Sequence, residues 1–382
     1  MRLLLSSVSA PMTECRAIAE AGFELTALVA RYCDCGDFGI ASAPVDFDSP
    51  FRLRSAPVFP TRPYPYSRFL SGVAEAIALS EPDGVLYWGE PSELAASQVL
   101  GAAKRLQPEA RLGVFVFENI DRQWRGKLSW LRGRAERRVL SYLDFAICAT
   151  GTARDRLVRL GVPGDRCHIV YPQVDATRFH PVDTADLRAE LDLQDRIVVG
   201  YCGRLVHEKG IDLLIDAVAE LPEEYALLLV GGGREQPTLL ARAAEIGIAG
   251  RVRHVDRVPV DQVPHYLCAM DMLVLPSRPV PQWQEQYGRV LPEAMLCGVP
   301  VIGSSSGAIP DVIGQAGLIF EQENVSALRE AILRLGSDER LRSDLSTVGL
   351  EHARAAFSNT YSRQLPEALR GSLAMPKRTP RS

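Results

Sequence analysis

Short, continuous apolar runs alternate with helical patterns along this chain. Of all the features of the sequence, this alternation most restricts the folds that the chain can adopt. Continuous runs, in place of strict polar and apolar alternation, indicate strands that helices cover on both faces. In the first half the runs lie at Arg2 to Leu5, Phe23 to Ala30, Gly84 to Trp88, Arg111 to Phe117 and Phe145 to Ala149. This pattern predicts a doubly wound parallel sheet.

A second series of apolar runs follows a linker-like stretch at 179–186, where a proline and small acidic residues precede a helical pattern. Its runs lie at Ile197 to Cys202, Ala226 to Val230, Val252 to Val255, Met272 to Leu275, Val299 to Gly303 and Leu318 to Phe320. The 382-residue chain also exceeds the size at which one core usually stops growing. We therefore expect an α/β protein with two Rossmann-like domains, at residues 1–180 and 181–350. Residues 351–382 should form a helix that returns toward the first domain and ends in a frayed basic tail.

The composition of the chain excludes several classes of function. A net charge of -4 gives no general attraction to nucleic acid, so we expect no nucleic-acid partner. No apolar stretch is long enough to span a membrane, and the cytoplasm is the default location. The Cys33 and Cys35 pair lacks zinc-site spacing, and Asp46 and Asp48 lie in an irregular, proline-rich stretch, so we expect no metal.

The loop from Gly200 to Gly210 follows a buried strand and precedes an amphipathic helix. Its glycines allow the backbone to approach a ligand, and the helix N-terminus offers unpaired N–H groups to an anion. Arg204 and Lys209 add two cations at the carboxyl end of the strand, where doubly wound sheets bind ligands. The segment therefore suits a pyrophosphate, although an ordinary turn with two solvated charges would look the same.

A second loop carries two carboxylates, Glu285 and Glu293, around a glycine and just before a helix. Glu293 complements the positive end of that helix, which is a sufficient structural explanation for it. Helix geometry does not account for Glu285. Together the two carboxylates could bind sugar hydroxyls and a ribose while loop amides bind phosphate.

In the motifs of these two loops, the chain resembles the retaining glycosyltransferases of family 4, the glycosyl transferase group 1 family, across roughly residues 196 to 335. The resemblance is carried by Gly203-Arg204, Lys209-Gly210, the Glu285 and Glu293 pair and Gly307-Ala-Ile-Pro-Asp-Val-Ile. It implies a GT-B fold, in which two Rossmann-like domains face a cleft. It also implies transfer of a sugar from a nucleotide-diphosphate donor to a carbohydrate, lipid-linked or small-molecule acceptor, with retention of configuration and without a metal.

The resemblance also implies roles for individual residues. Arg204 and Lys209 would bind the diphosphate and stabilise charge on the leaving group. Glu285 would contact the transferred sugar and Glu293 the ribose. The remaining donor contacts would come from Gly203, Gly288, Arg289, Val290 and Val258, the last in a segment that frames the base.

The N-terminal half departs from the family pattern. Ser6 to Ala10 stands where a glycine pair is usual, and Glu118-Asn119 where a histidine and an acid are usual. Glu118 and Asn119 are candidates for contacting a sugar or acceptor, or else for capping a helix. The basic segment 122–138, with two tryptophans, could rest on an anionic bilayer, but we favour a solvated helix face.

Two other functions use similar folds. A sugar-nucleotide epimerase would bind the same donor without transferring the sugar, and the Glu285 and Glu293 pair argues against it. A non-catalytic nucleotide-sugar-binding homologue would fit the atypical N-terminal half, but every charged donor-side residue of the family motif is present. We therefore favour catalysis.

Overall fold

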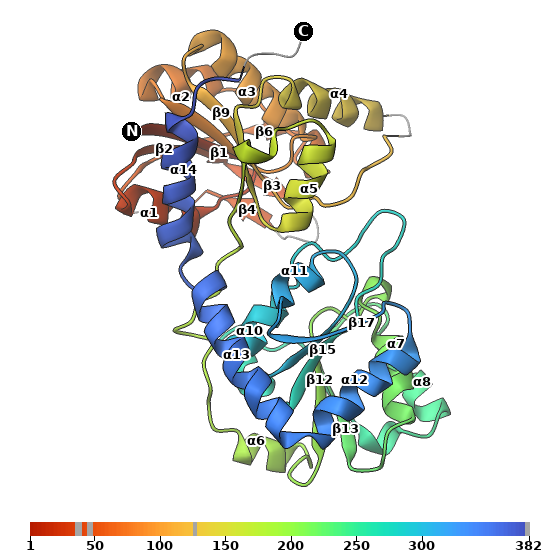
Figure 1. Cartoon of the computed structure of the whole chain (residues 1–382). Coiled ribbons are helices and arrows are strands. Elements are labelled where there is room, and N and C mark those ends of the chain that lie inside the picture. Colours follow the sequence, from red (N-terminus) through yellow and green to blue (C-terminus); the bar gives the residue numbers. More distant parts are fainter. Residues whose placement is uncertain (35–39, 44–48, 125–127, 379–382) are drawn as a thin grey trace. The chain divides into compact units, whose positions relative to one another are not determined.

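The computed structural model of the protein describes residues 1–34, 40–43, 49–124 and 128–378. Cys35, Asp46 and Asp48 lie outside these residues, as do positions 125–127 of the basic segment and the last four residues of the tail. The chain forms two compact units, Met1–Tyr171 with Thr360–Ser382 and Pro172–Asn359 (Figure 1). The first unit therefore contains both ends of the chain.

Unit 1 contains a seven-stranded parallel sheet in the order β11-β10-β9-β8-β1-β2-β5. Its strands are β1 (Arg2–Ser7), β2 (Glu24–Ala30), β5 (Arg52–Ala56), β8 (Gly84–Trp88), β9 (Arg111–Val116), β10 (Phe145–Cys148) and β11 (Cys167–Ile169). The shorter strands β3 (Tyr32–Asp34), β4 (Ile40–Ser42), β6 (Val58–Phe59) and β7 (Arg68–Phe69) pair as β3-β4 and β6-β7. The parallel sheet confirms the fold predicted for this half.

Helices cover both faces of the unit 1 sheet. They are α1 (Met12–Glu20), α2 (Val73–Ser80), α3 (Leu94–Leu106), α4 (Ser129–Leu140), α5 (Gly151–Arg159) and α14 (Leu365–Ala374), and a π-helical turn at Thr360–Gln364 precedes α14. Alternate strand residues enter different cores: Leu4 packs with residues of α2 and α3, whereas Leu3 and Leu5 pack with residues of α1 and α14. This arrangement explains the continuous apolar runs of the sequence.

Unit 2 contains a six-stranded parallel sheet in the order β14-β13-β12-β15-β16-β17. Its strands are β12 (Ile197–Cys202), β13 (Tyr225–Val230), β14 (Val252–Val255), β15 (Met272–Leu275), β16 (Val301–Ser304) and β17 (Gly317–Phe320). Its helices are α6 (Ala185–Glu190), α7 (Ile211–Ala219), α8 (Gln236–Glu245), α9 (Val263–Cys268), α10 (Val290–Leu296), α11 (Ile309–Ile313), α12 (Val325–Ser337) and α13 (Glu339–Phe357). The strand order reverses between β12 and β15, which is the position where such sheets bind ligands.

Three local expectations differ from the structure. Soon after Asp46 and Asp48, where we expected irregular structure, the chain forms the parallel edge strand β5, whose sequence Arg-Leu-Arg-Ser-Ala has no continuous apolar run. The single helix expected within residues 351–382 is divided between the end of α13 and α14 by the π-helical turn. The beginning of the tail, expected to fray, is hydrogen-bonded to unit 1, where the backbone N–H of Arg378 donates to Asp144 at 2.9 Å.

The C-terminal helix α14 completes the second core of unit 1. Leu365 and Leu369 are fully buried against the sheet, and Tyr361 meets the Trp88 ring edge-on at 6.0 Å between centroids. In Figure 1, α14 lies beside α1 on this face of the sheet. Residues more than 300 positions from the first strand are therefore part of its core.

We predict that Leu369→Ala lowers the free energy of unfolding of unit 1 by about 2–5 kcal/mol, because it leaves a cavity under α14. Urea unfolding followed by tryptophan fluorescence measures this, since Trp88 lies in the same core. Leu79→Ala is the control, because Leu79 is 53% exposed on α2. Its effect should stay within about 0.5 kcal/mol. Equal effects of the two substitutions would show that α14 does not stabilise this core.

Candidate functional site

The loops that leave β12 and β15 lie at the point where the strand order of unit 2 reverses. Lys209, after β12, and Glu285, after β15, form an ion pair there, with 2.5 Å between Nζ and Oε2. Both side chains are largely buried, with 14% and 8% of their surfaces exposed. Two residues that the sequence places 76 positions apart are thus brought together by strand order, because β12 and β15 are neighbours in the sheet.

Further contacts hold this ion pair in place. Ser277 donates a hydrogen bond to Oε2 of Glu285 at 2.7 Å, and the ammonium of Lys209 lies over the Trp283 ring at 4.9 Å. The backbone N–H of Ala308 donates to the carbonyl of Glu285 at 2.9 Å. Neither Ser277 nor Trp283 was a predicted site residue, although the position of Ser277 just after a buried strand was a usable signal.

Glycines bring the neighbouring loops close to one another. Gly210 has φ +68°, and a Cβ there would lie 2.2 Å from the carbonyl oxygen of Pro276, just after β15. A Cβ at Gly307 would lie 2.1 Å from the carbonyl oxygen of Glu285. Neither position can hold a side chain without moving backbone, so both glycines are needed for the packing around the Lys209 and Glu285 pair.

Arg204 follows Gly203 in the loop after β12, and its side chain is exposed. The buried hydroxyl of Tyr201 donates to the carbonyl of Arg204 at 2.8 Å, and this contact orders the loop. Burial, together with the nearby charge of Glu285, raises the pKa of Tyr201 well above its ordinary value, so this phenol stays protonated and acts as a donor.

Glu293 lies in the first turn of α10, whose N-cap is Arg289. Gly288 precedes it with φ +72°, and Val290 is the first helical residue. The Glu293 carboxylate makes no hydrogen bond or ion pair with any residue that the structure describes. Burial raises its pKa to about 7, against the opposing charges of Arg289 and Arg178. Glu293 is thus a partly buried acid whose hydrogen-bonding capacity remains for a ligand.

The loops after β13 and β14 lie beside each other at the same edge of the sheet. A Cβ at Gly232 would lie 2.8 Å from Oδ1 of Asp256, and one at Gly231 would lie 2.1 Å from the carbonyl oxygen of Gly203. Val258 is partly buried in the loop after β14, beyond Asp256. The segments expected to frame a base are therefore continuous with the Gly203 loop.

Unit 1 places a buried acidic group at the carboxyl ends of β8 and β9. Oε1 of Glu90 accepts the backbone N–H groups of Phe117 and Glu118 at 2.9 and 3.0 Å, while its Oε2 is buried without a hydrogen-bond partner among the described residues. Burial, and then the charge of Glu118, raises the pKa of Glu90 to about 7. The sequence analysis missed Glu90, although Gly89-Glu90-Pro91 directly follows a buried strand.

Glu118 and Asn119 do not cap a helix, because the next helix, α4, begins only at Ser129. Glu118 is 7% exposed and forms an ion pair with Arg122. The side-chain amide of Asn119 donates to Thr152 at 3.4 Å. The capping alternative is therefore wrong, and both residues remain candidates for contacting a ligand at this edge of unit 1.

In the basic segment, the Trp124 indole donates to Glu136 at 2.9 Å, and Arg132 lies over the Trp124 ring. Trp130 is 55% exposed. In the part of the chain described, no helix has the length and hydropathy needed to cross a membrane. No group of three or more His, Cys, Asp or Glu side chains that could hold a metal ion occurs among the described residues.

Each unit is an α/β domain with a parallel sheet, and unit 2 carries a cation and carboxylate pair at its topological switch point. Two such domains in one chain form a GT-B fold of the kind found in glycosyltransferases. Solved structures agree: Anabaena HepE in complex with UDP has a TM-score of 0.73 at 18% identity, covering 97% of this chain and 100% of that one. The sucrose-phosphate synthase of Thermosynechococcus elongatus has a TM-score of 0.72 at 21% identity, covering 98% and 100%.

Family models specify the class further. Residues 183–351 match the glycosyl transferases group 1 model, and residues 12–173 match the glycosyl transferase 4-like domain. The chain therefore contains a glycosyl transferase 4-like domain followed by a glycosyl transferases group 1 domain. This confirms the resemblance drawn from the loop motifs.

Curated relatives share part of the chain. A D-inositol 3-phosphate glycosyltransferase of Mycobacteroides abscessus is 33% identical over 60% of this chain and 52% of its own length. A GDP-mannose-dependent alpha-(1-6)-phosphatidylinositol monomannoside mannosyltransferase of Mycolicibacterium smegmatis is 31% identical over 62% of this chain and 65% of its own. The matched region thus spans between about half and two thirds of these relatives.

We predict that Glu293→Gln stabilises the protein above neutral pH and not in acid. The pKa of Glu293 rises from 4.5 to about 7 on folding, so the folded state binds this proton more tightly than the unfolded state does. The cost of ionising the buried carboxyl is therefore absent below about pH 4.5 and grows as the pH rises to about 7. The substitution removes this cost, roughly 1–3 kcal/mol above pH 7.

Thermal unfolding of the wild type and the Gln variant at about pH 4.5 and about pH 8 measures this difference. Glu330→Gln is the control, since Glu330 is exposed on α12 and should show no pH-dependent difference. A Glu293→Gln variant that is less stable than the wild type at both pH values would contradict the prediction.

Proposed function

We propose that this chain is a glycosyltransferase that moves a sugar from a nucleotide-diphosphate donor to a sugar, lipid-linked or small-molecule acceptor. The observation that carries the proposal is the buried Lys209 and Glu285 ion pair at the switch point of unit 2. It lies within the region that matches the group 1 model. The cation of this pair suits the charged diphosphate of a donor, and the carboxylate suits the hydroxyls of the donor's sugar.

In this proposal, Arg204 and Lys209 bind the diphosphate, and their charges stabilise the negative charge that grows on it as the glycosidic bond breaks. Glu285 accepts hydrogen bonds from hydroxyls of the transferred sugar, and Glu293 does so from the ribose. The loop residues Gly203, Gly288, Arg289 and Val290 line the diphosphate and sugar, and Val258 lies near the base.

We further propose transfer with retention and without a metal, in the cytoplasm. The acceptor oxygen bonds to the anomeric carbon from the face that the leaving group vacates. The electron pair of the broken bond stays with the departing diphosphate, which takes the acceptor proton. A metal is unnecessary for charge stabilisation because Arg204 and Lys209 supply fixed positive charge. On the acceptor side, we assign Glu118, Asn119 and Glu90 of unit 1 as candidate contacts.

The names of related proteins support a nucleotide-sugar donor. One curated relative is described as GDP-mannose-dependent, and HepE was solved in complex with UDP. Because the two proteins use or bind nucleotides with different bases, a donor screen should include nucleotide sugars of several bases.

We predict that one nucleotide sugar among UDP, GDP, ADP and dTDP sugars raises the melting temperature of the purified chain, with no effect of EDTA. Binding to the native state alone stabilises it by about 2.7 kcal/mol when the ligand is at a hundred times its Kd. Arg204→Ala should abolish the shift because a diphosphate contact is lost. Arg340→Ala is the control, since Arg340 is 92% exposed on α13. A shift that EDTA removes would contradict the metal-free mechanism.

We also predict that Glu285→Gln lowers kcat at least about a hundredfold while the chain remains folded. Glutamine keeps the size of the side chain and an amide oxygen that can accept a hydrogen bond from Lys209, whereas alanine would remove both the charge and the acceptor. Sugar transfer to acceptor, donor binding and melting temperature are measured together, with Glu330→Gln as the control. Unchanged transfer would refute the role of Glu285. Donor binding without transfer, in the wild type as well, would indicate a non-catalytic homologue, and donor epimerisation would indicate an epimerase.

A further inference from the structure

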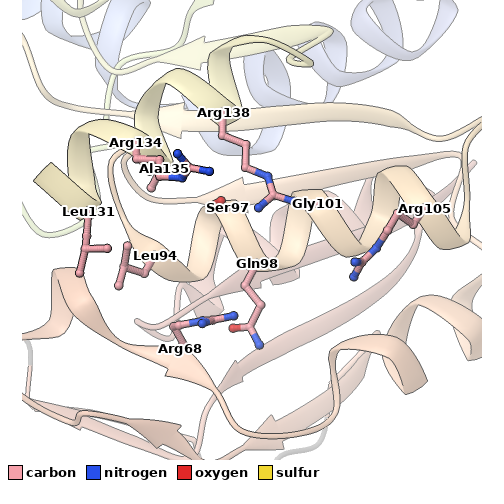
Figure 2. A pocket seen from close by; sticks show the side chains of 10 residues that line it. All are labelled: Arg68, Leu94, Ser97, Gln98, Gly101, Arg105, Leu131, Arg134, Ala135 and Arg138. Carbon is pink, nitrogen blue, oxygen red and sulfur yellow. The ribbon is translucent and has the colours of Figure 1, made fainter.

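Unit 1 contains a pocket of about 330 Å³ between the outer faces of α3 and α4. Its walls come from three elements, and Figure 2 shows their side chains around one hollow. From α3 come Leu94, Ser97, Gln98, Gly101 and Arg105, from α4 come Leu131, Arg134, Ala135 and Arg138, and from β7 comes Arg68. The spacing of three and four residues puts each helix's contribution on a single face.

The lining of this pocket is strongly positive. Among the residues that the structure describes, this lining includes the four arginines Arg68, Arg105, Arg134 and Arg138 and no aspartate or glutamate. None of the four forms an ion pair with a carboxylate of the described residues. By contrast, Arg156 on the neighbouring helix α5 pairs with Glu136 and is buried. Four clustered guanidinium groups without a counter-charge produce a local field that attracts anions.

The packing of α3 makes this pocket a defined hollow. The side-chain amide of Gln98 bonds to both the N–H and the carbonyl of Phe69, at 2.8 and 2.7 Å, and so fixes β7 and its Arg68 against α3. The lack of a side chain at Gly101 leaves space for Arg138, since a Cβ there would lie 3.4 Å from a guanidinium nitrogen of Arg138. The backbone that carries Arg68 is therefore held against α3, which lowers the entropic cost of placing this arginine at the pocket.

We propose that this pocket binds a small ligand that carries at least two phosphate groups, either free or as a lipid headgroup. Guanidinium forks match phosphate oxygens in bidentate geometry, and arginines from three elements can hold more than one group. The volume is at the lower end for small-molecule sites and fits a phosphorylated sugar or polyol. The site lies in unit 1 and uses none of the donor residues, so it stands independently of the proposed function.

Calorimetric titration of inorganic pyrophosphate tests the site. The protein carries Arg204→Ala, so that the proposed diphosphate site of unit 2 does not contribute. On this background, Arg138→Gln should weaken binding at least about tenfold, because it removes a charge-assisted contact. Arg137→Gln is the matched control: it removes the same charge from the next position of α4, outside the pocket lining. Melting temperatures verify that each variant is folded.

A second arm distinguishes the source of the phosphate. Co-sedimentation compares phosphatidylcholine vesicles with and without phosphatidylinositol phosphate, using the same variants. Loss of pyrophosphate binding in Arg138→Gln alone supports a free ligand. Loss of vesicle binding in Arg138→Gln alone, without pyrophosphate binding, supports a headgroup. Equal effects of Arg137→Gln and Arg138→Gln in both arms, or no effect of either, would overturn the proposal, because binding would then not depend on the pocket.

Discussion

The candidate site of unit 2 depends on the buried ion pair between Lys209 and Glu285. Two charges are withdrawn from water here, and their attraction offsets that cost only if the geometry is good and further hydrogen bonds are made. Ser277 donates such a hydrogen bond, the Trp283 ring adds a cation–π contact, and Gly210 and Gly307 permit the close loop packing. The neighbouring positions of β12 and β15 in the sheet are what bring the two charges together.

Lys209 is held by Glu285, the carboxylate that the proposed mechanism assigns to the sugar. A donor diphosphate would compete with Glu285 for the ammonium, because both are anionic acceptors. If the Lys209 ammonium bonds to the diphosphate, oxygen lone pairs of Glu285 become available to accept hydrogen bonds from sugar hydroxyls. On the proposed mechanism, donor binding and preparation of the sugar contact would then be one event.

Much of this architecture could be predicted from the sequence, because central strands of a parallel sheet are buried on both faces and appear as continuous apolar runs. Edge strand β5 was missed because its exposed side is polar, so no such run exists. The motif identified Lys209 and Glu285 individually, but their contact depends on strand order, which no local pattern contains. Glu90 was missed because its burial arises from the neighbouring segment at Phe117.

Most charged groups in the described interior are satisfied, as Arg156 is by Glu136, and this makes the exceptions informative. Among the described residues, the Glu293 carboxylate lies partly buried without a polar partner and Glu90 has one unpartnered oxygen, whereas the four arginines of the pocket are exposed and have no carboxylate in its described lining. Each of the two buried carboxylates reduces stability relative to a paired or apolar alternative. Proteins tolerate such local conflicts chiefly where a ligand resolves them. The unpaired charges of both units therefore point to binding sites, independently of the family motif that identified only one of them.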